Sequence, residues 1–149
     1  MNWGEQVALV TGASSGIGFE MARQLADAGA QVFASARREQ RLAQLAAEFP
    51  AGRITPLVAD LAEAGAGARL VKQVLAAAGR LDLLVNNAGY GELVKADEQT
   101  TEAVARQMQV NFMAVIEATL AAIPAMKSQG GGRILNVASI VGHMGLPGI

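Results

Sequence analysis

The stretch TGASSGIG, residues 11–18, decides the fold of this chain because of what stands on either side of it. An apolar run, QVALVT at 6–11, leads into the stretch and has the length and composition of a buried strand. After it, apolar residues recur at helical spacing from Ile17 to Ala28, and Gly29 follows. The sequence therefore predicts a strand that enters a glycine-rich turn and a helix that leaves it.

This turn has the features of a phosphate-binding loop. Gly12 allows a tight turn, while Gly16 and Gly18 allow a pyrophosphate to approach the backbone and the helix to pack close to the strand. The N–H groups and positive dipole of the helix N-terminus favour anions, and Ser14 and Ser15 add hydroxyl donors. The alternative, an ordinary glycine-rich turn, is disfavoured by the strand–helix units that follow.

The alternation of strand and helix continues along the chain. Further strand-like runs stand at 31–36, 53–60, 81–89 and 132–139. Helical patterns stand at 42–49, 70–78, 98–110 and 112–128. Such alternation predicts an α/β fold, in which about five parallel strands form one doubly wound sheet with helices on both faces. Pro56 cannot donate to a ladder, so its strand is predicted to lie at the sheet edge.

The composition argues against several classes of protein. The chain has 149 residues, 52% of them hydrophobic and 17% charged, with a formal net charge of -1. These values fit a single domain over residues 1–149 and give no basic patch for nucleic acid. The absence of cysteine and the single histidine argue against disulfides and a metal site. No signal peptide or membrane-spanning apolar run is recognised, so we expect a cytoplasmic protein.

Small and polar residues gather where the predicted strands end. Because the carboxyl ends of parallel strands meet at one edge of the sheet, these residues are expected to lie close together. They are Gly12–Gly18, Ala36–Arg38, Asp60, Asn86–Gly89 and Ser139. The sequence therefore predicts a ligand site at this edge.

The end of the second strand indicates which dinucleotide would bind. A carboxylate here would hold the ribose 2′-hydroxyl of NAD, but Ala36 is followed by Arg37 and Arg38. A guanidinium can bind a 2′-phosphate through two hydrogen bonds. Two positive charges at a helix N-terminus are otherwise unfavourable. The residues therefore favour NADP over the alternative that these arginines merely solvate the start of a helix.

Together, and in order along the whole chain, these motifs resemble those of the short-chain dehydrogenase/reductase family. The resemblance implies a Rossmann-type fold and an NADP-dependent oxidoreductase that interconverts carbonyl and alcohol groups of a small-molecule substrate by hydride transfer. Asp60 and Leu61 resemble the pair that holds the adenine, and NNAG at 86–89 resembles the fourth-strand motif beside the ribose. The implied cofactor-binding residues are Gly12, Ser14, Ser15, Gly16, Ile17, Gly18, Arg37, Arg38, Asp60, Leu61, Asn87, Ala88 and Gly89.

The resemblance also implies catalytic residues. Asn111 resembles the asparagine that orders a water in the proton relay, and Ser139 resembles the serine that hydrogen-bonds the substrate. The family's acid/base tyrosine would fall at about position 152, with its lysine four residues later, both beyond Ile149; Tyr90 does not match it. A polypeptide of these 149 residues is therefore predicted to be inactive. The alternatives are a non-catalytic NADP-binding or interaction protein and a fragment of a longer chain.

The helix predicted at 112–128 carries an apolar stripe. Its members are Phe112, Val115, Ile116, Thr119 and Ile123. In the family this helix packs in a dimer interface, which implies a homo-oligomer, although core packing explains the stripe equally well. On the preceding helix, Glu102 and Arg106 are spaced to form a surface pair.

Overall fold

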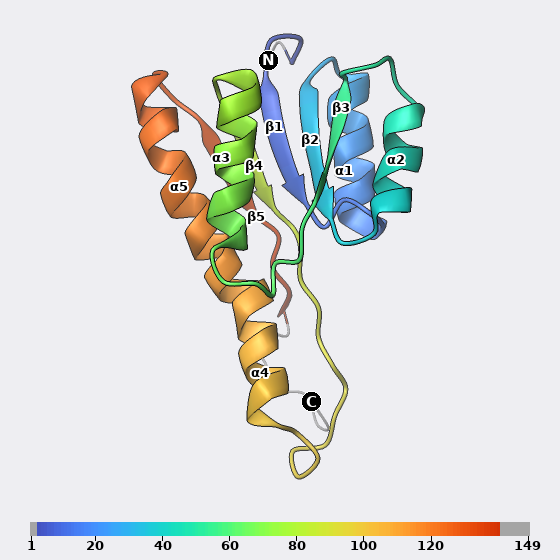
Figure 1. Cartoon of the computed structure of the whole chain (residues 1–149), viewed down its shortest axis with the longest axis vertical. Coiled ribbons are helices and arrows are strands. Elements are labelled where there is room, and N and C mark those ends of the chain that lie inside the picture. Colours follow the sequence, from blue (N-terminus) through green and yellow to red (C-terminus); the bar gives the residue numbers. More distant parts are fainter. Residues whose placement is uncertain (1–2, 141–149) are drawn as a thin grey trace.

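Strands and helices alternate through residues 3–140, the part of the chain that the computed structural model describes (Figure 1). The strands are β1 (Val7–Thr11), β2 (Gln31–Ala36), β3 (Ile54–Val58), β4 (Leu83–Asn86) and β5 (Arg133–Asn136). The helices are α1 (Gly16–Asp27), α2 (Glu39–Ala47), α3 (Ala66–Ala78), α4 (Thr101–Met108) and α5 (Ala114–Ser128). A π-helical turn, η1 (Gln109–Met113), joins α4 to α5. Strands are thus present at all five predicted positions. Three of them end earlier than predicted, because residues 59–60, 87–89 and 137–139 lie in the loops after β3, β4 and β5.

The five strands form one parallel sheet in the order β3-β2-β1-β4-β5. This order confirms the predicted doubly wound α/β fold. β1 pairs with β2 on one side and with β4 on the other, so the order of the strands reverses beside β1. Such a reversal opens a crevice at the carboxyl ends of the strands, because consecutive loops leave in opposite directions. β3 lies at an edge of the sheet, as Pro56 predicts.

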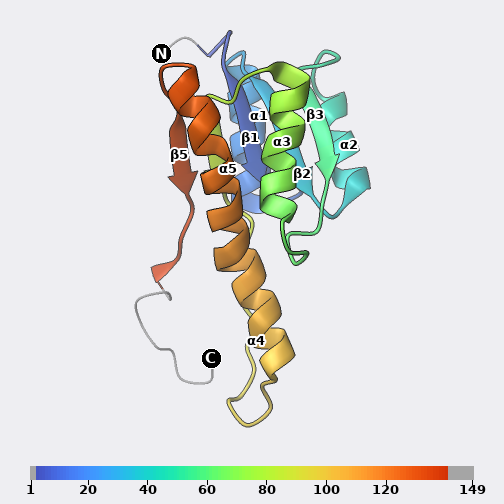
Figure 2. The ribbon, with the colours of Figure 1, turned by 60° about the vertical axis from the view of Figure 1, so that its left-hand side comes forward.

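Side chains of each strand alternate between the two faces of the sheet. On β1, Ala8 and Val10 pack with α1 and α2, whereas Val7 and Leu9 pack with α3 and α5. Figure 2 shows α3 and α5 together on one face, with α1 and α2 behind the sheet. All four β1 side chains are at most 4% exposed. Burial on both faces explains why β1 reads as a continuous apolar run in the sequence.

Small residues bring α3 and α5 into close contact. A Cβ on Gly67 would collide with the main-chain oxygen of Ala114 and lie 3.0 Å from the nitrogen of Ala118. Beside this contact, the Glu117 carboxylate accepts hydrogen bonds from Gly65 N at 2.9 Å and Gly67 N at 3.2 Å. The cap residue of α3 is a glycine, so a side chain from α5 satisfies the first N–H groups of α3 instead.

α5 buries a different set of residues from the predicted stripe. The buried residues are Ala114, Ala118, Ala122 and Met126. In contrast, the side chains of Phe112 and Ile116 are 52% and 38% exposed. Core packing therefore does not account for this part of the stripe, and a homo-oligomer that buries it stays a prediction.

One helical run among the described residues, Thr101–Ser128, is long and apolar enough to cross a membrane by length and composition alone. Its α5 part packs on α3 through Ala118 and Ala122, and Glu117 bonds the first turn of α3. These contacts give the α5 part of the run a place in the α/β core, whereas no residue of α4 is buried. The expectation that no segment spans a membrane stays a prediction.

The Gly67→Ala substitution tests the α3–α5 contact. Alanine normally stabilises a helix interior relative to glycine by roughly 0.5–1 kcal/mol. Here the methyl group would push α5 away from α3, and such overpacking costs about 1–3 kcal/mol. We expect a lower free energy of unfolding in urea denaturation. The control Gln73→Ala, at an exposed position of α3, should change it by less than about 0.5 kcal/mol. A Gly67→Ala protein as stable as the parent would contradict the contact.

Candidate nucleotide-binding site

The glycine-rich turn packs directly against the loop that follows β4. A Cβ on Gly12, whose φ is 70°, would lie 2.8 Å from Asn87 Nδ2. A Cβ on Gly18 would collide with the same amide nitrogen and with the Gly12 carbonyl oxygen. Gly16 has a φ of 59° and open space beside its Cα, and the neighbouring Ile17 is 63% exposed. Gly12 and Gly18 thus permit the packing, while Gly16 leaves open space at the N-terminus of α1.

The side chain of Thr11, at the end of β1, fastens these two loops together. Its hydroxyl oxygen accepts hydrogen bonds from Asn87 N at 3.0 Å and Ala88 N at 3.1 Å, and it donates to the Val85 carbonyl at 3.3 Å. The Asn87 amide returns a bond to the Thr11 carbonyl at 2.9 Å. Sequence reasoning missed this role of Thr11, because its partners lie more than 70 positions away along the chain.

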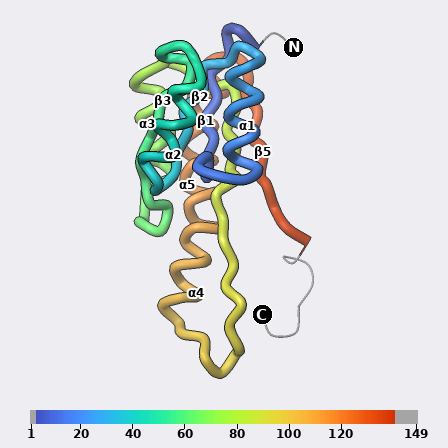
Figure 3. Tube along the Cα trace, turned by 90° about the vertical axis from the view of Figure 1, so that its right-hand side faces the viewer, coloured from blue at the N-terminus to red at the C-terminus, as the bar shows by residue number. Residues whose placement is uncertain are grey.

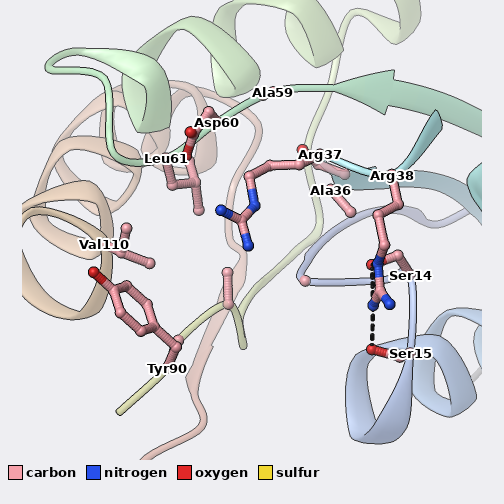
Figure 4. Close-up of a pocket in the computed structure, with 14 residues that line it drawn as sticks. Ser14, Ser15, Ala36, Arg37, Arg38, Ala59, Asp60, Leu61, Tyr90 and Val110 are labelled. Atoms are coloured by element: carbon pink, nitrogen blue, oxygen red, sulfur yellow. Dashed lines mark hydrogen bonds between the residues drawn. The ribbon is translucent and has the colours of Figure 1, made fainter. Parts of the chain in front are cut away.

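The two arginines after β2 point in different directions. Arg38 turns toward the glycine-rich turn, and its guanidinium donates to Ser14 Oγ at 2.9 Å and to Ser15 Oγ (Figure 4). Arg37 extends instead into the pocket beyond the turn (Figure 4). The turn is also held to β2 through a hydrogen bond from Ala13 N to the Ser35 carbonyl, 3.0 Å long. Two cations and two hydroxyl groups therefore lie near the exit of β2. The last residue of this strand is Ala36, so the position offers no carboxylate.

Asp60 stands at the exit of β3, beside Leu61. The Ala62 N–H, which donates to Asp60 Oδ1 at 3.0 Å, holds the pKa of this carboxyl below its ordinary value despite partial burial. A hydrogen bond from Arg106 and the charge of Arg37 lower this pKa further. Asp60 is therefore ionised at neutral pH and offers oxygen acceptors to a ligand. Arg106 pairs with Asp60 rather than with Glu102, so the predicted surface pair is wrong.

A pocket of about 200 Å³ lies between these groups. The predicted residues that line it are Gly12, Ser14, Ser15, Arg37, Arg38, Asp60, Leu61, Ala88 and Gly89. Tyr90 and Val110 also line it, although the sequence alone gave them no cofactor-binding role (Figure 4). The Tyr90 hydroxyl is buried and has no hydrogen-bond partner among the described residues. An unmade hydrogen bond of this kind is unfavourable, so a bound ligand or water is its natural partner.

The two residues predicted to be catalytic lie in different elements. Asn111 belongs to η1, and its side chain bonds the main chain of Tyr90 twice, from Tyr90 N to Oδ1 at 3.0 Å and from Nδ2 to the Tyr90 carbonyl at 2.7 Å. A π-helical turn often marks a functional position. Ser139 follows β5 and is exposed. Residues 141–149, among them His143, lie outside the described part of the chain.

The strand exits thus carry a glycine-rich turn, two arginines, an aspartate and the NNAG loop around one pocket. This is the arrangement of a dinucleotide-binding α/β sheet. The model of the short chain dehydrogenase family matches residues 6–149, and the chain belongs to this family, as its motifs predict.

Two curated relatives and a solved structure give the extent of the likeness. A 3-ketodihydrosphingosine reductase of Bacteroides thetaiotaomicron is 34% identical over 142 residues, which are 95% of this chain and 50% of that protein. An uncharacterised oxidoreductase of Bacillus subtilis is 40% identical, over 97% of this chain and 57% of that one. The crystal structure of a metagenomic short-chain oxidoreductase in complex with NADP is 36% identical, with a TM-score of 0.88 over 95% of this chain and 66% of that chain. The chain spans about half the length of the curated relatives.

Thr11→Val tests whether the hydrogen bonds of the Thr11 hydroxyl hold the glycine-rich turn and the loop after β4 together. Valine keeps the shape and strand preference of threonine but removes the hydroxyl, which leaves the amides of Asn87 and Ala88 without their acceptor. We expect the free energy of unfolding to fall by about 1–3 kcal/mol, measured by urea denaturation. Thr11→Ser retains the hydroxyl and should lose less. Equal stability of the valine and serine proteins would show that the hydroxyl bonds do not hold the loops.

Proposed function

We propose that this chain is the NADP-binding part of a short-chain oxidoreductase that interconverts carbonyl and alcohol groups of a small molecule. The observation that carries the choice of NADP is a cluster formed by four pocket-lining residues: Arg37, and Arg38 with its hydrogen-bond partners Ser14 and Ser15. A 2′-phosphate adds about two negative charges and three acceptor oxygens, which this cluster would match. The solved NADP complex of a relative supports the same choice.

The remaining pocket residues take the roles that the family resemblance implies. The N-terminus of α1, from Gly16 through Ile17 to Gly18, would face the pyrophosphate. Asp60 and Leu61 would hold the adenine, and the loop of Asn87, Ala88 and Gly89 would lie beside the ribose. The cofactor would supply a hydride, and the protein would bind the cofactor and orient its reactive ring toward the substrate.

Ser139 and Asn111 would act on the substrate side of the reaction. The Ser139 hydroxyl would hydrogen-bond the substrate oxygen. Two bonds of the Asn111 amide are taken up by Tyr90, which leaves one acceptor lone pair and one N–H to order a water. The proton for the developing alkoxide would come from the family's tyrosine, which would fall at about position 152. A cytoplasmic homo-oligomer remains part of this proposal, with the exposed Phe112 and Ile116 in its interface.

Titration with NADPH and NADH tests the cofactor preference. We expect NADPH to bind at least about ten-fold more tightly, because the 2′-phosphate gains charge-assisted hydrogen bonds. Arg37→Asp should abolish or reverse the preference, since its carboxylate would repel the phosphate and accept the 2′-hydroxyl. Equal affinities of the parent chain for the two cofactors would contradict the assignment of NADP.

Arg41→Ala is the matched control for this experiment. Arg41 is exposed on α2, close in sequence to Arg37 and Arg38, but does not line the pocket. Its removal should reduce the affinity for NADPH by less than about three-fold, through long-range charge alone. A loss as large as that of Arg37→Asp would mean that general positive charge, rather than a built phosphate site, accounts for the binding.

A polypeptide of these 149 residues should show no NADPH-dependent carbonyl reduction. It would lack the positioned proton donor, whose contribution to such reactions is typically about 10²–10⁴-fold. A longer polypeptide that adds a tyrosine at about position 152 and a lysine four residues later should be active, as measured by oxidation of NADPH with a panel of small carbonyl compounds. Turnover by the 149-residue polypeptide would require a different acid and would contradict this mechanism.

A further inference from the structure

An ion pair at the edge of the pocket joins α4 to the exit of β3, and the proposed function gives this ion pair no role. Arg106 Nη2, on α4, donates to Asp60 Oδ2, at the exit of β3, over 2.9 Å. The two residues are 46 positions apart, and Asp60 lines the pocket. A charged side chain thus reaches from a distant helix to the group proposed to meet the adenine.

α4 has little else to hold it against the sheet. None of its residues is buried, and Figure 3 shows it in the arm that extends beyond the strands. The next turn, η1, makes the second link, because the Asn111 side chain bonds the main chain of Tyr90. The segment 101–113 therefore contacts two pocket-lining residues, Asp60 and Tyr90, and its own Val110 also lines the pocket.

The contact with Arg106 fixes the direction of the Asp60 carboxylate. Oδ1 already accepts the Ala62 N–H, so the two oxygens are held from different sides by a main-chain donor and a guanidinium. A carboxylate has about four acceptor positions, so each oxygen retains capacity for a ligand. Without Arg106, the group would keep the local bond to Ala62 but would rotate more freely about its Cβ–Cγ bond.

We propose that Arg106 is a positioning residue, which holds Asp60 so that the pocket selects an adenine base. Adenine presents an exocyclic amine, which donates to a carboxylate, whereas hypoxanthine presents an oxygen at the same position, which a carboxylate repels. Discrimination of this kind depends on an acceptor of fixed direction, since a mobile or hydrated carboxylate turns away from the wrong base at little cost. This proposal rests on the proposed function, because it assumes that a dinucleotide occupies the pocket.

The experiment compares two ligands that differ at one position of the base. NADP⁺ and its deamino analogue, in which hypoxanthine replaces adenine, are titrated into the chain by isothermal calorimetry. We expect the parent to prefer NADP⁺ by about ten-fold, the size of one good hydrogen bond to a charged group. In Arg106→Ala this preference should fall to about two-fold or less. Because both ligands carry the same phosphates, the general loss of positive charge cancels in the ratio.

A double-mutant cycle shows whether Arg106 acts through Asp60. Asp60→Ala should abolish the preference for NADP⁺, and adding Arg106→Ala to it should change the ratio no further. Arg106→Lys keeps the charge and one donor, so it should restore part of the preference. The matched control is Arg23→Ala, which removes an arginine paired with Glu20 and Asp27 on α1, away from the pocket, and should leave the ratio unchanged.

Each remaining outcome overturns a distinct statement. If Arg106→Ala weakens both ligands equally, Arg106 only tethers α4, and the proposal is wrong. If the parent binds both ligands equally, Asp60 does not read the base, and the proposal fails while NADP binding stands. If the parent prefers NADP⁺ and Arg106→Ala keeps this preference, Arg106 is not needed for the selection of adenine, and the proposal is wrong. If the parent binds neither ligand, the proposed function itself is wrong, and the role of Arg106 with it.

Discussion

The Thr11 hydroxyl makes the bonds on which the site depends. It ties the first residues of the β4 loop to the end of β1, and the Asn87 amide then fills the space that Gly12 and Gly18 leave open. The glycine-rich turn and the NNAG loop are therefore one packed unit rather than two loops that happen to be near each other. Any ligand that lies on this unit meets main-chain groups whose positions are set before it binds.

The fold could be predicted from the sequence because its signals are local and repeated. The buried strands β1 and β4 read as continuous apolar runs because helices cover both faces of the sheet there, and α1, α2 and α3 carry apolar residues at helical spacing. Pro56 has no N–H to donate to a neighbouring strand, which favours the edge position of β3. The buried face of α5 was not predictable in the same way. Its contact with α3 depends on alanine and glycine, whose small size matters only in the presence of a partner helix.

The candidate site was predictable where a motif carries its own chemistry. The glycines, the arginines and Asp60 could be assigned to one edge of the sheet because parallel strands bring their exits together. Of these residues, Gly12, Gly89, the two arginines and Asp60 line one pocket, whereas Gly16 and Gly18 do not. The contacts of Thr11 and Arg106 could not be predicted, because their hydrogen-bond partners lie far away in the sequence. Arg106 shows the limit: its spacing from Glu102 predicts a helical pair, but the fold brings the carboxylate of Asp60 within reach.

The position of β1 at the centre of the sheet has a consequence for biosynthesis. The strand can pair with β2 as soon as that strand is made, but the Val7 N–H bonds the side chain of Asp82, 75 positions later. Val7 and Leu9 become buried only when α3 and α5 cover their face of the sheet. Contacts of such long range make folding slow and leave apolar surface uncovered in the meantime. During synthesis on the ribosome, this face of β1 therefore stays uncovered, and open to aggregation, until α5 has emerged.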